Sequence, residues 1–312
     1  MINVTEPYLP KKKDFKEKIN AIWSINHLTN NGPQLQSLEG RIKAYLNQKN
    51  DVVIVANGTI GLQIALKCSA PKGEVITTPF TYIATSSATK WEGYDIKFVD
   101  IDPRTFNIDP ILIEKAITKK TKIILVTHVF GNPADIKQIE TIAKNNNLKV
   151  IYDSSHSFGV QYNKKSINDF GFASVTSTHA TKIFHTVEGG LISSPNKKLI
   201  SQFKQVRNFC HRGEKFTGVG INAKNSEIHS AMGHCVLDQM DKILAQRKKQ
   251  YYKYIQQLSG NSMIQFQKIN EQCTKYNYSY FPIVFNKIKH LHATIKILNM
   301  NNIYPRRYFY PS

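Results

Sequence analysis

Short apolar runs that alternate with helical patterns constrain the fold of this chain more than any other feature. Strand-like runs separated by helical segments of about 10–15 residues are typical of a mainly parallel sheet covered by helices on both faces. We therefore expect strands at 52–56, 74–77, 96–101, 122–126, 149–152 and 175–176, with helices at 60–67 and 135–146. The sequence thus predicts an α/β fold.

The pattern changes after Gly190. A short returning strand is expected at 191–194, a long helical stretch at 226–258, an alternating strand at 278–285 and a helix at 290–298. A chain of 312 residues can hold one large domain and a smaller one. We therefore predict a large domain over residues 1–245 and a small α+β domain over residues 246–312.

Composition limits the class of protein. Hydrophobic residues make up 41% of the chain, which fits a globular protein. No apolar stretch reaches the roughly 18 residues needed to span a bilayer, and the N-terminus has no basic segment followed by an apolar one. The four cysteines lack CxxC spacing, so a zinc site or a disulfide framework is not expected. These features predict a cytoplasmic protein with reduced thiols and no metal.

The formal net charge of +20 could indicate a nucleic acid, an acidic surface or an anionic small substrate as the partner. The lysines are dispersed in short groups such as 11–13 and 119–120, and no basic stripe with interleaved aromatic residues is present. A general bias toward Lys, Asn and Ile is sufficient to explain the charge. Nucleic-acid binding is therefore not predicted.

One carboxylate and one lysine fall at the ends of two expected strands. Asp153 follows the apolar run 148–152, and Lys182 follows the strand at 175–176 and precedes a Gly-Gly turn. Ligands bind at the carboxyl edge of open α/β sheets, so both side chains are expected there. A lysine can form a Schiff base with pyridoxal phosphate, and a carboxylate can keep its pyridine nitrogen protonated. Considered alone, Lys182 would be interpreted as a surface residue and Asp153 as a helix cap.

Three further segments lie near strand ends and have simpler interpretations. The turn 57–59 can bind a phosphate at a helix start, where free N–H groups converge, or it can be an ordinary capped turn. Tyr82 can lie flat on a planar ring or pack in the core. His156 taken alone is more typical of a structural histidine than of a catalytic one.

Together these segments resemble the sugar-nucleotide aminotransferases of the DegT/StrS type, which are fold-type I pyridoxal phosphate enzymes. The similarity covers most of the chain, in order and in spacing. The matching stretches are 28–33, 57–62, 100–102, 128–133, 153–156, 179–182 and 222–227.

The resemblance implies a role for each candidate residue. Lys182 would form the Schiff base and act as general acid and base, and Asp153 would bind the pyridine nitrogen. Tyr82 would stack on the ring, and His156 would lie beneath it. The cofactor phosphate would be held by Gly58, Thr59 and Ser177, and by Asn222 from a partner subunit.

The implied reaction is a transamination in two halves. An amino acid such as glutamate gives its amine to pyridoxal phosphate, and a 4-keto-6-deoxy nucleotide sugar takes it. The segments 179–182 and 188–190 resemble the branch that makes dTDP-4-amino-4,6-dideoxyhexoses, which serve O-antigen and other lipopolysaccharide biosynthesis. The resemblance also implies a cytoplasmic homodimer with an active site shared between its subunits.

Three alternatives remain open. Family chains normally continue past the motif at 306–311, so the small domain is expected to be incomplete, and the chain could be a catalytically silent regulatory relative. It could also aminate a 3-keto sugar. Sugar dehydratases of this type replace the Schiff-base lysine with histidine, and the presence of Lys182 disfavours that class. Asn57 stands where a serine is more common.

Overall fold

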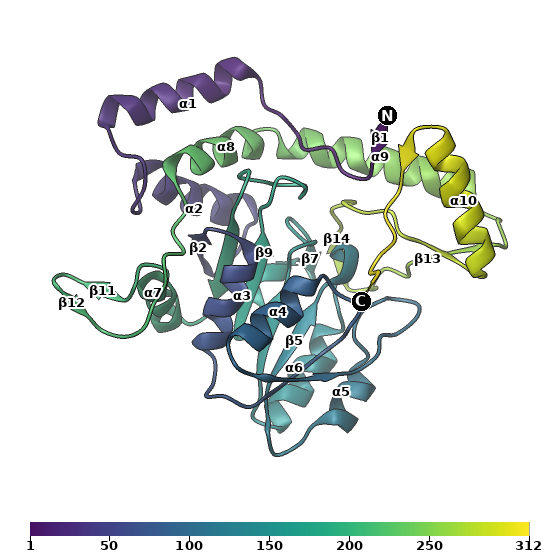
Figure 1. The fold of residues 1–312 in the computed structure, drawn as a ribbon, viewed down its shortest axis with the longest axis horizontal. Coiled ribbons are helices and arrows are strands. Elements are labelled where there is room, and N and C mark those ends of the chain that lie inside the picture. Colours follow the sequence, from purple (N-terminus) through teal and green to yellow (C-terminus); the bar gives the residue numbers. More distant parts are fainter. Residues whose placement is uncertain (312) are drawn as a thin grey trace.

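A seven-stranded sheet forms the centre of the computed structural model, which describes residues 1–311 (Figure 1). Only one strand, β10, runs antiparallel to its neighbours, and the other strand pairs are parallel. The predicted mainly parallel sheet is therefore confirmed. In spatial order the strands are β2 (Asp51–Val55), β10 (Gly190–Ser194), β9 (Ala173–Ser177), β6 (Lys149–Asp153), β5 (Thr121–Thr127), β3 (Glu74–Thr77) and β4 (Asp95–Phe98).

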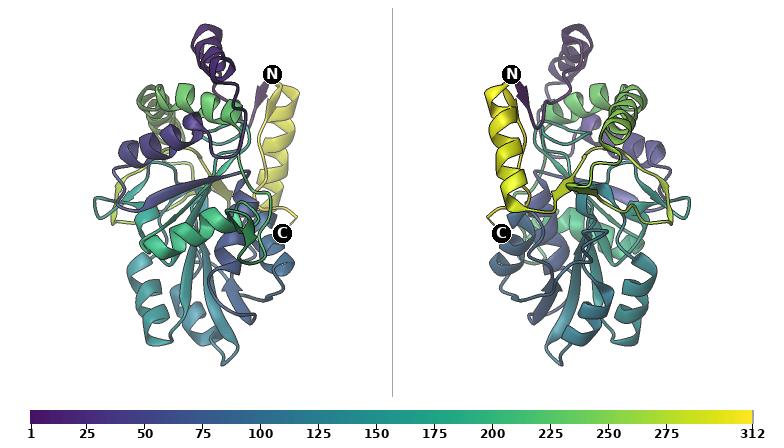
Figure 2. Two further views of the ribbon diagram at one scale, coloured as in Figure 1. Left: turned by 90° about the vertical axis from the view of Figure 1, so that its left-hand side faces the viewer. Right: turned by 90° about the vertical axis from the view of Figure 1, so that its right-hand side faces the viewer.

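Helices cover both faces of this sheet (Figure 2). Alternate strand residues belong to opposite cores: Val53 and Val55 pack with α3 and α7, whereas Val52 and Ile54 pack with α2 and α8. This alternation follows from the two-residue period of a strand. One layer contains α3 (Gly58–Lys67), α4 (Ile83–Trp91) and α7 (Lys197–Val206); the other contains α2 (Pro33–Tyr45), α5 (Pro110–Ala116), α6 (Ile136–Asn145) and α8 (Glu227–Leu237).

The long helical stretch predicted over 226–258 is confirmed, and two helices fill this range. They are α8 and α9 (Met240–Leu258), with a break at residues 238–239. The apolar period continues across the break since Val236 and Met240 are buried in the same core. Hydrophobic periodicity therefore gave no sign of the interruption.

The strand predicted over 278–285 is mostly wrong, because only β15 (Ile283–Phe285) is a strand. The preceding residues form a connector anchored to the segments that follow β5 and β6. The Asn277 amide donates to the carbonyls of His156 and Phe158, and the Tyr276 hydroxyl donates to the Phe130 carbonyl. Tyr278 has a left-handed backbone with φ of 54°, which a strand cannot include.

The remaining elements are short or peripheral. The helix α1 (Lys12–Ile25) projects from the body and contacts α8 (Figure 1). The strand β1 (Ile2–Asn3) pairs in parallel with β16 (Ile303–Tyr304), beside α10 (Ile288–Met300). The others are β7 (Gln161–Tyr162), β8 (Lys165–Ser166), β11 (His211–Arg212), β12 (Lys215–Phe216), β13 (Ile264–Phe266), β14 (Cys273–Lys275) and the 3-10 turns η1 (Val129–Gly131) and η2 (Ile167–Asp169).

The predicted domain boundary at 245/246 falls inside α9, and the division into domains stays a prediction. Within residues 1–311, no helix combines the length and the apolar character that crossing a bilayer requires.

Candidate active site

Four strands bring the candidate site residues to one edge of the sheet. Asp153 is the last residue of β6, and its neighbours in register are Thr127 on β5 and Val175 on β9. Two residues further along β9, Ser177 pairs with Gly190 at the start of the antiparallel β10. The carboxyl ends of β5, β6 and β9 therefore lie together with the beginning of β10.

Asp153 is buried, and both of its carboxylate oxygens accept a hydrogen bond. The Thr85 hydroxyl on α4 donates to Oδ2 at 2.9 Å, and the Ser155 backbone N–H donates to Oδ1 at 3.1 Å. Two donors fix the plane of the carboxylate. Asp153 is thus an acceptor with a fixed orientation at the sheet edge.

Lys182 lies in the loop that joins β9 to β10. Its N–H donates to the His179 carbonyl at 2.8 Å, and the loop is closed by hydrogen bonds between Thr178 and both Thr186 and Gly189. Lys182 Nζ lies 3.5 Å from the Tyr280 hydroxyl. The structure therefore holds the amine within a closed loop rather than on a free surface helix.

Burial and neighbouring charges shift the pKa of the Lys182 amine. Burial lowers the pKa of Lys182, the nearby Asp153 and Tyr82 oppose that shift, and Arg306 adds to it. The result is an amine that loses its proton more readily than an ordinary lysine does. The charges of Asp153, Tyr82 and Arg306 are therefore close enough to Lys182 to influence its amine.

His156 and Tyr82 differ in exposure. The buried His156 accepts a hydrogen bond at Nδ1 from the Phe130 N–H, and its ring centroid lies 4.7 Å from that of Tyr280. Burial lowers the pKa of His156 well below its usual value, and the charge of Lys182 adds to this shift. Tyr82 is 52% exposed at the start of α4, so its ring does not pack in the core.

The turn 57–59 begins α3 beside the end of β9. Asn57 caps the helix by accepting from the Ile60 N–H at 2.9 Å. A Cβ on Gly58 would lie 2.9 Å from that of Ser177, so only glycine allows this close approach. Thr59 follows in the first turn of α3, where helix N–H groups have no partner within the helix. Gly58, Thr59 and Ser177 are therefore brought together.

Asn222 is placed apart from the buried groups. Its side chain is exposed and lines a cavity of about 420 Å³ beside the end of β2. The lining includes Thr29, Asn30, Glu188 and Lys224, and it contains neither Lys182 nor Asp153.

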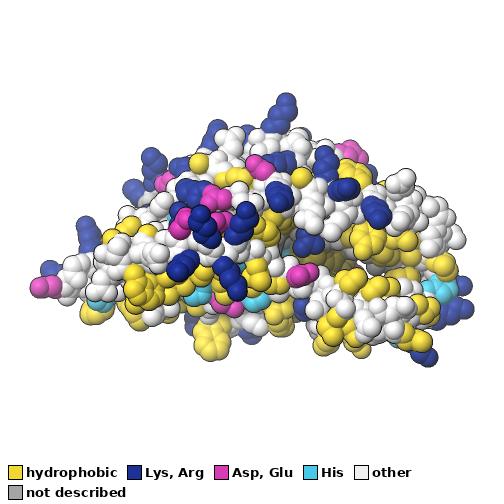
Figure 3. All heavy atoms as spheres, turned by 90° about the horizontal axis from the view of Figure 1, so that it is seen from above, with side chains coloured by type: hydrophobic (Ala, Val, Ile, Leu, Met, Phe, Trp, Pro, Cys, Tyr) yellow, Lys and Arg dark blue, Asp and Glu magenta, His cyan; other side chains and the backbone are white. Residues whose placement is uncertain are grey.

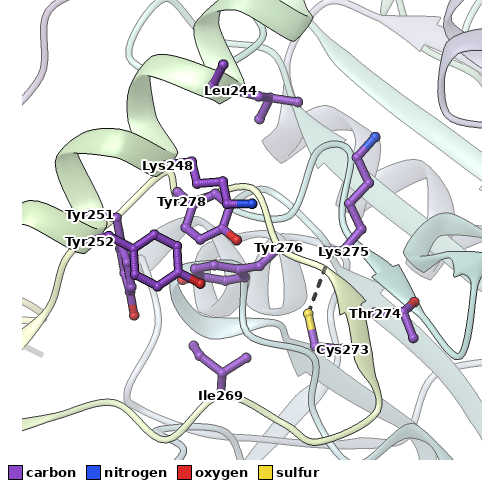
Figure 4. Close-up of a pocket in the computed structure, with 11 residues that line it drawn as sticks. Leu244, Lys248, Tyr251, Tyr252, Ile269, Cys273, Thr274, Lys275, Tyr276 and Tyr278 are labelled. Atoms are coloured by element: carbon purple, nitrogen blue, oxygen red, sulfur yellow. Dashed lines mark hydrogen bonds between the residues drawn. The ribbon is translucent and has the colours of Figure 1, made fainter. Parts of the chain in front are cut away.

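Another cavity, of about 450 Å³, lies between α9 and β14 (Figure 4). Tyrosines and lysines dominate its wall, including Tyr251, Tyr276, Lys248 and Lys275. None of the candidate residues lines it, so it is distinct from the candidate active site. In residues 1–311 there is also no group of three His, Cys, Asp or Glu side chains that could hold a metal ion.

Sequence reasoning missed three residues of this site: Thr85, Tyr280 and Arg306. Thr85 is one of several hydroxyl residues on α4, and nothing in the spacing distinguishes it. Tyr280 lies in the segment that was expected to be a strand. Arg306 lies in a motif that was recognised without a role. The family pattern was the one signal that pointed to the segment of Arg306, and no signal pointed to Tyr280.

These groups fit pyridoxal phosphate. A readily deprotonated amine, a carboxylate held by two donors and a glycine-containing helix start lie at one sheet edge. They match the aldehyde, the pyridine nitrogen and the phosphate of that cofactor.

Comparison with known proteins identifies the family. Residues 10–312 match the family model described as "DegT/DnrJ/EryC1/StrS aminotransferase family". The chain is 39% identical to a dTDP-4-amino-4,6-dideoxy-D-glucose transaminase of Shigella dysenteriae, over 99% of this chain and 85% of that protein.

Solved structures agree with this assignment. DesI, determined in the presence of its TDP-sugar product, superposes with a TM-score of 0.93 at 26% identity, covering 99% of this chain and 79% of DesI. A PLP-dependent aminotransferase from Bacillus cereus, described as putative, gives 0.91 at 26% identity, covering 100% and 86% of the two chains. The fold, the arrangement of the site and the sequence similarity agree, and the chain belongs to the DegT/DnrJ/EryC1/StrS family of pyridoxal-phosphate-dependent sugar aminotransferases.

Proposed function

We propose that this enzyme transfers an amine from glutamate to a dTDP-linked 4-keto-6-deoxy sugar and forms a dTDP-4-amino-4,6-dideoxyhexose. The observation that carries the proposal is the pair of Asp153 and Lys182 at one sheet edge. The similarity to the Shigella transaminase supports the choice of sugar and nucleotide. An amino sugar of this kind suits O-antigen or other lipopolysaccharide biosynthesis in the cytoplasm.

Lys182 and Asp153 carry the chemistry in this proposal. When bound, pyridoxal phosphate supplies an aldehyde that takes up an amine and a ring that withdraws electrons. Lys182 would hold the aldehyde of the cofactor, and its Nζ would take up the proton that must leave the donor carbon. The lowered pKa of Lys182 favours the uncharged amine for both tasks. Asp153 would accept a hydrogen bond from the pyridine nitrogen.

The other candidates position the cofactor. Tyr82 would cover one face of the ring from the start of α4, and His156 would lie on the other face. The first N–H groups of α3 at Gly58 and Thr59, together with the Ser177 hydroxyl, would bind the phosphate. The exposed Asn222 would reach the phosphate of a second subunit, so the proposed active unit is a homodimer.

The charge distribution is consistent with an anionic small substrate. On the face seen in Figure 3, Lys and Arg side chains are scattered and acidic side chains lie among them. A net charge of +20 attracts a nucleoside diphosphate without a continuous basic stripe. We propose no role in nucleic-acid binding and no insertion into a membrane.

The direct test supplies purified protein with pyridoxal phosphate, glutamate and a panel of 4-keto and 3-keto nucleotide sugars. We expect 2-oxoglutarate and an amino sugar only from the dTDP-linked 4-keto-6-deoxy substrate, identified by mass spectrometry and NMR. A product formed only from a 3-keto sugar would overturn the assigned position. Cofactor binding without any product would favour the silent regulatory alternative.

A lysine variant tests the mechanism. Lys182→Ala should abolish the absorption band of the Schiff base between cofactor and enzyme and lower the rate at least about a hundredfold, because general acid–base catalysis contributes at least that much. Lys119→Ala, at an exposed lysine far along the chain, is the matched control and should keep both properties. An unchanged spectrum in Lys182→Ala would remove this residue from the mechanism.

A further inference from the structure

We infer that Thr85 is a positioning residue for Asp153 and is the last member of a one-way chain of hydroxyl groups. The chain runs from Thr127 through Thr81 and Thr85 to the carboxylate. The inference deepens the proposed function and rests on it, because it concerns the group that would face the pyridine nitrogen of the cofactor.

The chain of hydroxyl groups is short, continuous and buried. Thr127 Oγ1 lies 2.9 Å from Thr81 Oγ1, which lies 2.9 Å from Thr85 Oγ1, which lies 2.9 Å from Asp153 Oδ2. All four side chains are buried, the most exposed being Thr81 at 6%. They come from the end of β5, the loop before α4, α4 itself and the end of β6.

The polarity of the chain follows from counting protons. An ionised carboxylate can only accept, so Thr85 must give its single hydroxyl proton to Asp153. The contact between Thr85 and Thr81 then requires Thr81 as the donor, and the contact between Thr81 and Thr127 requires Thr127 as the donor. Hydrogen bonds that point the same way polarise one another, most strongly in a buried environment.

The chain of hydroxyl groups donates a hydrogen bond to one carboxylate oxygen of Asp153, and a backbone N–H donates to the other. Thr85 binds Oδ2, and the Ser155 N–H binds Oδ1. Rotation of the carboxyl group would break one of the two bonds. The chain of hydroxyl groups therefore holds Asp153 in one orientation.

Thr89 provides a matched control on the same helix. It is buried like Thr85, and its hydroxyl donates to the Thr85 carbonyl at 2.8 Å instead of joining the chain. Thr89→Val removes a buried hydroxyl of the same size from α4 without touching Asp153. Loss of stability common to both variants can thus be separated from loss of the donor.

The test measures affinity for pyridoxal phosphate and the pH dependence of the absorption of the bound cofactor. Thr85→Val should weaken affinity for the cofactor about tenfold, because Asp153 loses one of the two donors that orient its carboxylate, and should shift the pH at which the absorption of the bound cofactor changes. Thr85→Ser, which keeps the donor, should return both values to within about twofold of wild type. Thr81→Val should have a smaller effect in the same direction, and Thr89→Val should have none.

A second measurement needs no cofactor. The Asp153 carboxyl signal in the carbon NMR spectrum of the free protein should shift in Thr85→Val, which loses the donor, and should stay at its wild-type position in Thr89→Val. An unchanged carboxyl signal and an unchanged affinity in Thr85→Val would overturn the inference while the proposed function stands. Failure of the wild-type protein to bind pyridoxal phosphate would instead overturn the proposed function.

Discussion

Two histidines behind the site are buried in the neutral state. His128 accepts from the Ala134 N–H at Nδ1, its ring lies 4.8 Å from that of Tyr152, and burial lowers its pKa to about 3. His156 accepts from Phe130 in the same way, and its pKa is also lowered. Because Nδ1 is the acceptor in both rings, the single proton lies on Nε2.

These histidines should make the protein sensitive to acid. The pKa in the folded state lies below the ordinary value of 6.5, so the unfolded chain binds more protons between these values, and stability falls as pH falls through 6.5 toward about 3. His128 alone should cost about 2 kcal/mol between neutral pH and about pH 5. Urea unfolding at both pH values measures this loss.

Two variants check the origin of that loss. His128→Asn, which keeps an acceptor for Ala134 but does not titrate, should flatten the pH dependence. His292→Asn, on the exposed side of α10, should leave it as in wild type. An equally steep dependence in His128→Asn would show that other groups cause the acid sensitivity.

The start of α2 is stabilised by a residue from a distant helix. Glu227, the first residue of α8, is fully buried, and its carboxylate accepts from the N–H groups of Gln34 and Leu35 at 2.7 and 3.0 Å. These are two of the free donors of the first turn of α2, which follows Gly32. A Cβ on Gly32 would lie 2.5 Å from Glu227 Cδ, so glycine permits this approach.

Removal of this cap should destabilise the protein. Glu227→Ala is expected to lower the free energy of unfolding by about 2 kcal/mol, because a helix cap and buried donors are lost together. Chemical denaturation gives the value. Glu214→Ala, in the exposed turn between β11 and β12, should change it by less than about 0.5 kcal/mol. A similar small change in Glu227→Ala would mean that water replaces the cap.

At the scale of elements, the sequence predicted the parallel strands well because their apolar runs are continuous and buried. The run 74–77 coincides with β3, and the runs at 122–126 and 149–152 differ from β5 and β6 by a residue or two. The break at residues 238–239 and the connector before β15 were not predictable in this way. Their structures depend on tertiary contacts, such as those of Asn277, that leave no periodic pattern.

At the scale of the whole molecule, topology decides which parts of the site can be predicted. Asp153 and Lys182 lie after adjacent strands, so the strand pattern alone placed both at one edge. Thr85, Tyr280 and Arg306 reach the same place from an inward helix face and from the last part of the chain. Only the packing of these distant segments brings them there.

The proposed homodimer can be tested by subunit mixing. Lys182→Ala and Asn222→Ala should each be weakly active alone. Equal amounts of the two variants are unfolded together and then refolded. The mixture should recover about a quarter of wild-type activity, since half of the dimers would contain one intact site of two. Analytical ultracentrifugation measures whether the refolded protein is a dimer. No recovery in a mixture that forms dimers would mean that Asn222 serves its own subunit.

The loop over residues 178–189 has one further consequence. It leaves the sheet at Ser177 and returns at Gly190, and these two residues are paired neighbours, so the loop begins and ends at the same point of the scaffold. Thr178 and its partners clamp its base. Side chains within such a loop can be substituted without displacing the strands that flank it. A substitution at the reactive amine can therefore alter the chemistry of the enzyme while the sheet keeps its structure.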